Sequence, residues 1–193
     1  MAERKLTRRE QAEQTRHHIF RCALELLEER DFEDIKIKEI VAAANVSVGS
    51  FYNYFHSKLD VYCESFELVD KFFAVTVAEK LTQPTARERI LCFFDEYARY
   101  CDELTGIKLT RLLFTVNNPL FERQVPEGIY SVLLRQVRFG QERGELQPLS
   151  AELTVQYLLI SARGLVYNWC TRNGDYDLRE IMGKYVSRLL KAL

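Results

Sequence analysis

The chain has 193 residues, 47% of them hydrophobic, which is enough for one or two small domains with a real core. Its formal net charge is −1, so the overall charge gives no sign of a nucleic-acid partner. No stretch approaches the roughly 18 apolar residues of a membrane span, and the five cysteines show no paired spacing. We therefore expect a soluble cytoplasmic protein with reduced thiols and no membrane partner.

Hydrophobic spacing predicts helices along the whole chain, with no alternating strand pattern and no internal repeat. The fold class is therefore all-α, with about nine helices. The expected helices span residues 8–30, 37–44, 48–55, 57–81, 85–104, 107–116, 123–143, 150–172 and 177–193.

The second and third expected helices are short and separated by a tight turn. Asn45 tolerates the left-handed backbone that such a turn requires, and Ser47 can cap the helix that follows. That third helix is too short to be stable alone, so a scaffold must hold it. Gly49 leaves little bulk between its first turn and whatever it approaches. Together the two helices predict a helix-turn-helix.

Local signals divide the rest of the chain. Ser57, Thr85 and Asp177 each stand three residues before an acidic residue, the pattern of a capping box. Residues 117–119, Asn-Asn-Pro, predict a turn, and residues 126–128 predict a kink in the helix expected at 123–143.

The run from residue 37 to residue 58 resembles the DNA-binding signature of the TetR family of bacterial transcriptional regulators. The residues that carry the resemblance are Ile40-Val41, Ala44-Asn45-Val46-Ser47, Gly49-Ser50, Tyr52-Asn53-Tyr54-Phe55 and Ser57-Lys58. Three positions depart from the usual pattern: Lys36 replaces a common capping Thr, Val48 a basic or small residue, and Leu59 a Glu. The first departure weakens a helix cap, and the second alters base preference.

The resemblance implies a ligand-responsive regulator that is not an enzyme and needs no cofactor or metal. It would have a three-helix DNA-binding domain at residues 1–57 and a helical effector-binding and dimerisation domain at residues 58–193. It would bind double-stranded operator DNA as a homodimer through its last two helices, act as a repressor, and leave the DNA when a small-molecule effector binds.

The expected DNA contacts lie on the third helix and beside it. They are Lys38, Val48, Gly49, Ser50, Tyr52, Asn53, Tyr54 and Lys58. The resemblance places Tyr52 and Tyr54 at the DNA, whereas Phe51 and Phe55 are expected to face inward. Lys58 would hold a phosphate together with the free amides of its helix. Core packing is the alternative for the tyrosines.

The resemblance also implies a small-molecule pocket in the C-terminal domain. The tentative lining residues are Tyr97, Cys101, Phe114, Tyr130, Arg163, Tyr167 and Trp169. For any one of them, ordinary core packing is the favoured interpretation.

Two alternatives are an enzyme and a helical protein without DNA-binding activity. For an enzyme, His18 and Cys22 could in principle hold a metal, but they lack the third and fourth ligands of a zinc site. Residues 1–60 contain ten Lys/Arg and eleven Asp/Glu, which suits a helical ligand-binding or interaction protein without DNA-binding activity. Against that, Arg4, Lys5, Arg8 and Arg9 gather at the N-terminus, and binding depends on where cations meet phosphates.

Overall fold

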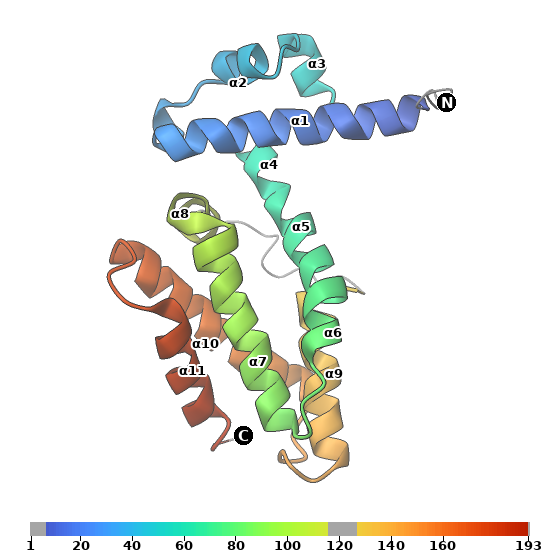
Figure 1. Ribbon diagram of the computed structural model, residues 1–193, viewed down its shortest axis with the longest axis vertical. Coiled ribbons are helices and arrows are strands. Elements are labelled where there is room, and N and C mark those ends of the chain that lie inside the picture. Colours follow the sequence, from blue (N-terminus) through green and yellow to red (C-terminus); the bar gives the residue numbers. More distant parts are fainter. Residues whose placement is uncertain (1–6, 116–126, 193) are drawn as a thin grey trace. The chain divides into compact units, whose positions relative to one another are not determined.

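A computed structural model describes residues 7–115 and 127–192 of the chain (Figure 1). The described residues are helical, with no strand among them, and they divide into two compact units, Met1–Ser65 and Phe66–Leu193. Arg4, Lys5, the predicted turn at 117–119 and the start of the helix expected at residue 123 lie outside the described residues, as does residue 126 of the predicted kink.

Unit 1 is built on one long helix. Helix α1 (Arg8–Glu29) begins with a capping box between Thr7 and Glu10, and α2 (Ile37–Ala43) and α3 (Val48–Tyr52) lie along one side of it (Figure 1). A 3₁₀ turn, η1 (Phe32–Asp34), connects α1 to α2, and α4 (Lys58–Cys63) closes the unit. Its core contains Ile19, Phe20, Ala23, Leu27, Ile35, Ile40, Val41, Phe51, Phe55, Val61 and Tyr62.

Unit 2 contains the remaining helices. They are α5 (Ser65–Phe72), α6 (Ala78–Lys80), α7 (Ala86–Arg99), α8 (Gly106–Thr115), α9 (Ile129–Glu142), α10 (Ala151–Thr171) and α11 (Leu178–Leu189). Helix α7 packs against both α9 and α11, and α10 packs against α8, α9 and α11. If α4, α5, η2 (Phe73–Val77) and α6 are counted as one helix and α7 with η3 (Tyr100–Leu104) as another, the described residues form nine α-helices, as the sequence predicts.

The expected helix over residues 57–81 is interrupted. A turn at Glu64 separates α4 from α5, and a π-helical turn, η2 (Phe73–Val77), follows α5. A second π turn, η3 (Tyr100–Leu104), extends α7. Hydrophobic spacing does not reveal these turns, because an apolar residue every three or four positions suits either geometry. Likewise, α3 ends at Tyr52 and not at residue 55.

The predicted caps are confirmed. Ser57 accepts the amide of Asp60, Thr85 that of Glu88, and Asp177 that of Glu180. Asn45 has a φ of 51°, as the turn between α2 and α3 requires. The predicted boundary between functional domains at residues 57 and 58 stays a prediction, because compactness places α4 in unit 1 without assigning it a role.

Gly140 lets α9 approach α7 closely. A Cβ at this position would lie 2.6 Å from the Cβ of Ala86 and 2.8 Å from Leu146 Cδ1. We expect Gly140→Ala to destabilise the protein by about 1–3 kcal/mol through overpacking, measured as a lower midpoint of urea unfolding. Adding Ala86→Gly should restore part of the loss. A Gly140→Ala variant as stable as the wild type would contradict this account of the contact.

Candidate nucleic-acid interface

Helix α3 and the residues just after it present two different faces. Phe51 and Phe55 are 0% and 1% exposed, whereas Tyr52 is 50% and Val48 42% exposed. Two buried phenyl rings therefore anchor a helix of five residues, and the opposite face is left on the surface. The expected inward position of Phe51 and Phe55 is confirmed, and Tyr52 lies outside the core.

The start of α3 is fixed by its cap. Ser47 Oγ accepts the amide of Ser50 at 3.0 Å, and the amide of Val46 donates to the carbonyl of Val41 at 2.9 Å. Gly49 is exposed, and a Cβ there would meet only Ser47 Oγ, at 3.8 Å. Unit 1 itself therefore gives no packing reason for a glycine at this position.

The other predicted contact residues differ in exposure. Lys38 and Asn53 are exposed, and Ser50, Tyr54 and Lys58 are partly buried. Val48, Tyr52, Lys38 and Lys58 line one groove of about 620 Å³, together with Glu33, Ile35, Lys36 and Ile37. The structure thus brings four of the predicted residues together. It adds Lys36, which the sequence analysis treats only as a weakened cap.

The cap of α2 is supplied by Glu39. Its Oε2 accepts the amide of Lys36 at 2.9 Å, and its Oε1 accepts a hydrogen bond from Arg30 at 2.8 Å. The hydrogen bond from Arg30, followed by that from the Lys36 amide, holds the pKa of Glu39 below its usual range. A lysine has no acceptor with which to cap the first amides of a helix, and the Lys36 side chain is exposed.

Lys58 has an environment that the sequence does not indicate. Its ammonium donates to the backbone carbonyls of Phe32 and of Ile35, the latter at 2.6 Å, and lies 4.1 Å from the centre of the Phe32 ring. Burial lowers the pKa of Lys58, and nearby carboxylates, Glu33 first, act in the opposite direction. The ammonium thus contacts the protein's own backbone.

A partly buried ion pair joins α1 to the end of α4. Arg16 lies 2.5 Å from a carboxylate oxygen of the buried Glu64, and its guanidinium lies 5.7 Å from the centre of the Phe55 ring. Tyr62 adds a second tie, since its hydroxyl donates to the carbonyl of Ala23 at 2.9 Å. Burial raises the pKa of Tyr62 to about 12, so this hydroxyl remains a donor at physiological pH.

The residues predicted for the effector pocket occupy different places in unit 2. Tyr97 and Cys101 are buried together, and burial raises the pKa of Tyr97 while a hydrogen bond from Arg163 opposes that rise. Trp169 is buried and donates to the carbonyl of Tyr176 at 3.1 Å. Phe114 and Tyr130 pack against the same core, half-buried.

Tyr167 does not belong to this core, because it lies on an exposed stripe of α10. The stripe consists of Leu153, Tyr157, Ile160, Gly164 and Tyr167. Their spacing of four, three, four and three residues places them on one face of a helix. This spacing is visible in the sequence, but the sequence alone does not distinguish an exposed face from a buried one.

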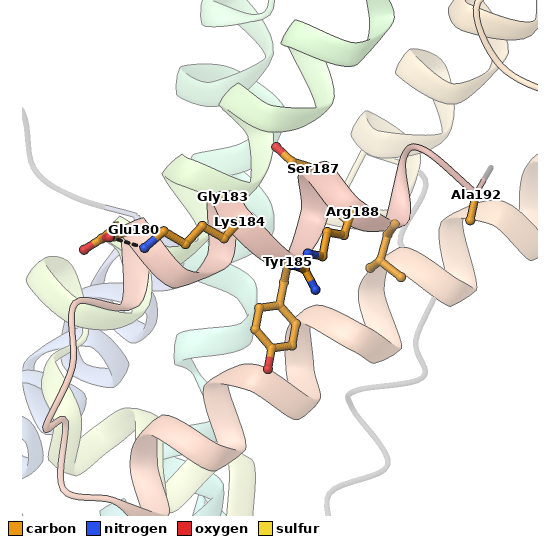
Figure 2. Close-up of a pocket in the computed structure, with 8 residues that line it drawn as sticks. Glu180, Gly183, Lys184, Tyr185, Ser187, Arg188 and Ala192 are labelled. Atoms are coloured by element: carbon orange, nitrogen blue, oxygen red, sulfur yellow. Dashed lines mark hydrogen bonds and ion pairs between the residues drawn. The ribbon is translucent and has the colours of Figure 1, made fainter.

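Helix α11 carries an open groove next to an exposed aromatic residue. Figure 2 shows the lining residues on α11 and the turn after it, with Lys184 reaching back to Glu180 and Tyr185 projecting from the helix. Tyr185 is 57% exposed, and Gly183 has no heavy atom within 4 Å of a built Cβ.

None of the described helices is both long enough and apolar enough to cross a bilayer. No group of three or more His, Cys, Asp and Glu side chains suited to a metal occurs in residues 7–115 and 127–192. His18 Nδ1 and Cys22 Sγ lie 3.9 Å apart on α1.

Part of unit 1 matches a known protein family. Residues 19–64 match the model of the bacterial regulatory proteins of the tetR family. The transcriptional regulator AcuR of Cereibacter sphaeroides is 39% identical over 56 residues, which are 29% of this chain and 26% of AcuR. The match thus spans about a quarter of that relative's length.

Solved structures resemble nearly the whole chain. FadR from Bacillus subtilis, in complex with stearoyl-CoA, superposes with a TM-score of 0.73 at 20% identity, covering 92% of this chain and 98% of FadR. FadR from Thermus thermophilus, a TetR-family repressor in complex with lauroyl-CoA, gives a TM-score of 0.72 at 26% identity, covering 91% and 92%. The first likeness is one of fold alone.

The matched helix-turn-helix, with its exposed α3, and the shared all-helical architecture agree with each other. The helix-turn-helix within residues 19–64 is therefore of the type found in the tetR family of bacterial regulatory proteins.

Proposed function

We propose that this chain is a transcriptional repressor that binds operator DNA as a homodimer and is released by a small-molecule effector. The observation that carries the proposal is the division of α3 into two faces: Phe51 on the helix and Phe55 just after it are buried, whereas Val48, Gly49 and Tyr52 are exposed. A helix held in this way fits the major groove of duplex DNA.

The exposed face of α3 supplies the sequence-reading contacts. Gly49 permits close approach, and Ser50 and Asn53 are hydrogen-bonding side chains for base edges or phosphates. Tyr52 and Tyr54 reach phosphates with their hydroxyls or thymine methyl groups with their rings. Val48 offers an apolar contact of the same kind.

Phosphate attraction comes from the start of α2. Lys38 is exposed on the rim of the groove next to α3, so its ammonium can reach a phosphate while α3 occupies the major groove.

Removing the Lys38 charge tests this contact. We expect Lys38→Ala to weaken binding to specific and random duplexes alike, and to reduce the slope of log affinity against log salt by about one per subunit. Fluorescence anisotropy over a salt series measures both quantities. As the matched control, Lys71→Ala removes an exposed lysine from unit 2. An unchanged salt slope for Lys38→Ala would exclude Lys38 as a phosphate contact.

The exposed α10 stripe and Tyr185 support dimerisation through the last two helices. Ile160 is 64% exposed, and Gly164 has no neighbour within 4 Å of a built Cβ. A second copy packed on this face would cover the apolar side chains and use the small residue for close helix contact. Two recognition helices about 34–36 Å apart would then meet successive turns of the groove.

A charge on the stripe tests the dimer. We expect Ile160→Lys to convert the protein to monomer in sedimentation equilibrium, because a lysine would have to be buried in an apolar interface. Glu142→Lys adds a lysine to the exposed surface of α9 and should leave the dimer intact. A dimeric Ile160→Lys variant would place the interface elsewhere.

For the effector we propose an acyl-CoA thioester, on the basis of the two FadR complexes and the aromatic interior of unit 2. The ring centroids of Phe72 and Tyr100 lie 5.1 Å apart, and those of Phe73 and Phe93 lie 4.8 Å apart. These rings join the π turns η2 and η3 to the core, and π turns are frequent at functional sites. An acyl chain suits such an apolar interior.

Trp169 is the chain's single tryptophan and gives a built-in probe. We expect lauroyl-CoA or stearoyl-CoA to change the fluorescence of Trp169. Over the same concentration range, the thioester should release a labelled duplex taken from the region upstream of the protein's own gene. Free coenzyme A is the control for the head group. This effector class is contradicted if free coenzyme A alone releases the DNA, or if neither thioester changes the fluorescence or releases the DNA. Either result leaves the DNA-binding proposal standing.

A further inference from the structure

We infer that Lys58 is a positioning residue for the helix-turn-helix, acting through the connection between α1 and α2 and not through a DNA phosphate. Its ammonium lies among the backbone carbonyls of Phe32, Glu33 and Ile35, with distances of 3.5 Å to Glu33 and 2.6 Å to Ile35. It also lies over the Phe32 ring.

The chemistry of this site suits an ammonium. Carbonyls at the end of a helical turn lack partners beyond those within the turn; here the ammonium joins the Ile35 amide on the Phe32 carbonyl and also donates to the carbonyl of Ile35. A lysine ammonium is a compact donor with three hydrogens and no acceptor, so one side chain can satisfy several converging carbonyl oxygens. The Phe32 ring adds a cation–π contact on the remaining side.

The same surroundings are unfavourable for a phosphate. The carboxylates of Glu33, Asp34 and Glu39 contribute negative charge around the ammonium, and the converging carbonyl oxygens add more. To hold a phosphate with its side chain, Lys58 would have to leave these oxygens and draw an anion towards three acidic residues. Lys36 and Lys38, exposed on the same groove, are free of that constraint.

The contact determines where α2 begins. Ile35 is held by Lys58 and lies two residues before Ile37, the first residue of α2. Glu39 and Arg30 fix the same junction from the other side. Since α2 packs against α3, the tie made by Lys58 sets the presentation of α3 as well.

The test rests on the proposed DNA binding, and it compares Lys58→Met and Lys58→Arg with Lys36→Met. Binding is measured to two labelled duplexes, the upstream region of the gene and a random sequence, over a salt series. Circular dichroism at the same temperature confirms that each variant is folded. Arginine keeps the charge for a phosphate, but its planar guanidinium does not fit a site shaped for a compact ammonium.

We expect both Lys58 variants to lose upstream-duplex affinity by about tenfold or more, the fold-change expected for losing a hydrogen bond to a charged group. Random-duplex affinity should fall less, so the ratio between the two duplexes decreases, while the salt slope stays at the wild-type value. Lys36→Met should show the reverse: a slope lower by about one per subunit and an unchanged ratio.

Two results would overturn the inference: a reduced slope in Lys58→Met that Lys58→Arg restores, or equal losses on both duplexes. Hydrogen exchange gives a measurement that needs no DNA. The amides of Asp34 and Ile35, bonded to Asp31 and Phe32, should exchange faster in both Lys58 variants, and unchanged exchange would also overturn it. If the wild type binds neither duplex, the proposed function fails. The hydrogen-exchange comparison still tests whether Lys58 holds the connection between α1 and α2.

Discussion

The recognition surface depends on the burial of two phenyl rings. A helix of five residues forms too few internal hydrogen bonds to be stable in water. Phe51 and Phe55 bury their rings almost completely in the core of unit 1, and apolar burial of this size is worth about 1.5–3 kcal/mol for each side chain. The outward residues of α3 are therefore left on the surface, where a partner can reach them.

The distribution of charge in unit 1 follows the same division between scaffold and surface. Although residues 1–60 carry slightly more acids than bases, many charges are used internally. Arg16 pairs with Glu64, Arg30 pairs with Glu39, and Lys58 binds backbone carbonyls. The balance of formal charge thus says little about the groove beside α3, where Lys36 and Lys38 are exposed.

The sequence predicted the features that depend on local chemistry. Helix caps at Ser57, Thr85 and Asp177, and the left-handed turn at Asn45, each rest on one residue and its neighbours, and each is present. What the sequence could not predict depends on contacts distant in the chain. Lys58 meets carbonyls 23 to 26 residues away, and no local pattern records them.

The same limit explains why the residues predicted for the effector pocket lie in different places. Tyr97 and Tyr167 belong to one aromatic class in the sequence, yet one is buried in the core of unit 2 and the other is on the surface of α10. Helical spacing shows that residues share a face, but the neighbours of that face come from the fold. Only the contacts of α10 with α8, α9 and α11 show which of its faces is covered.

The exposed face of α10 contains a glycine that lowers helix stability and that no contact within one chain explains. A glycine inside a helix is about 1 kcal/mol less favourable than alanine, and Gly164 stands in the middle of α10 with open space where a Cβ would be. Gly140 incurs the same cost in α9, but there the close approach of Ala86 and Leu146 requires it. A helix packed closely on the stripe would give Gly164 the role that α7 gives Gly140. The contrast between two helical glycines, one required by the fold and one not, is therefore an argument that the stripe has a partner, independent of its apolar side chains.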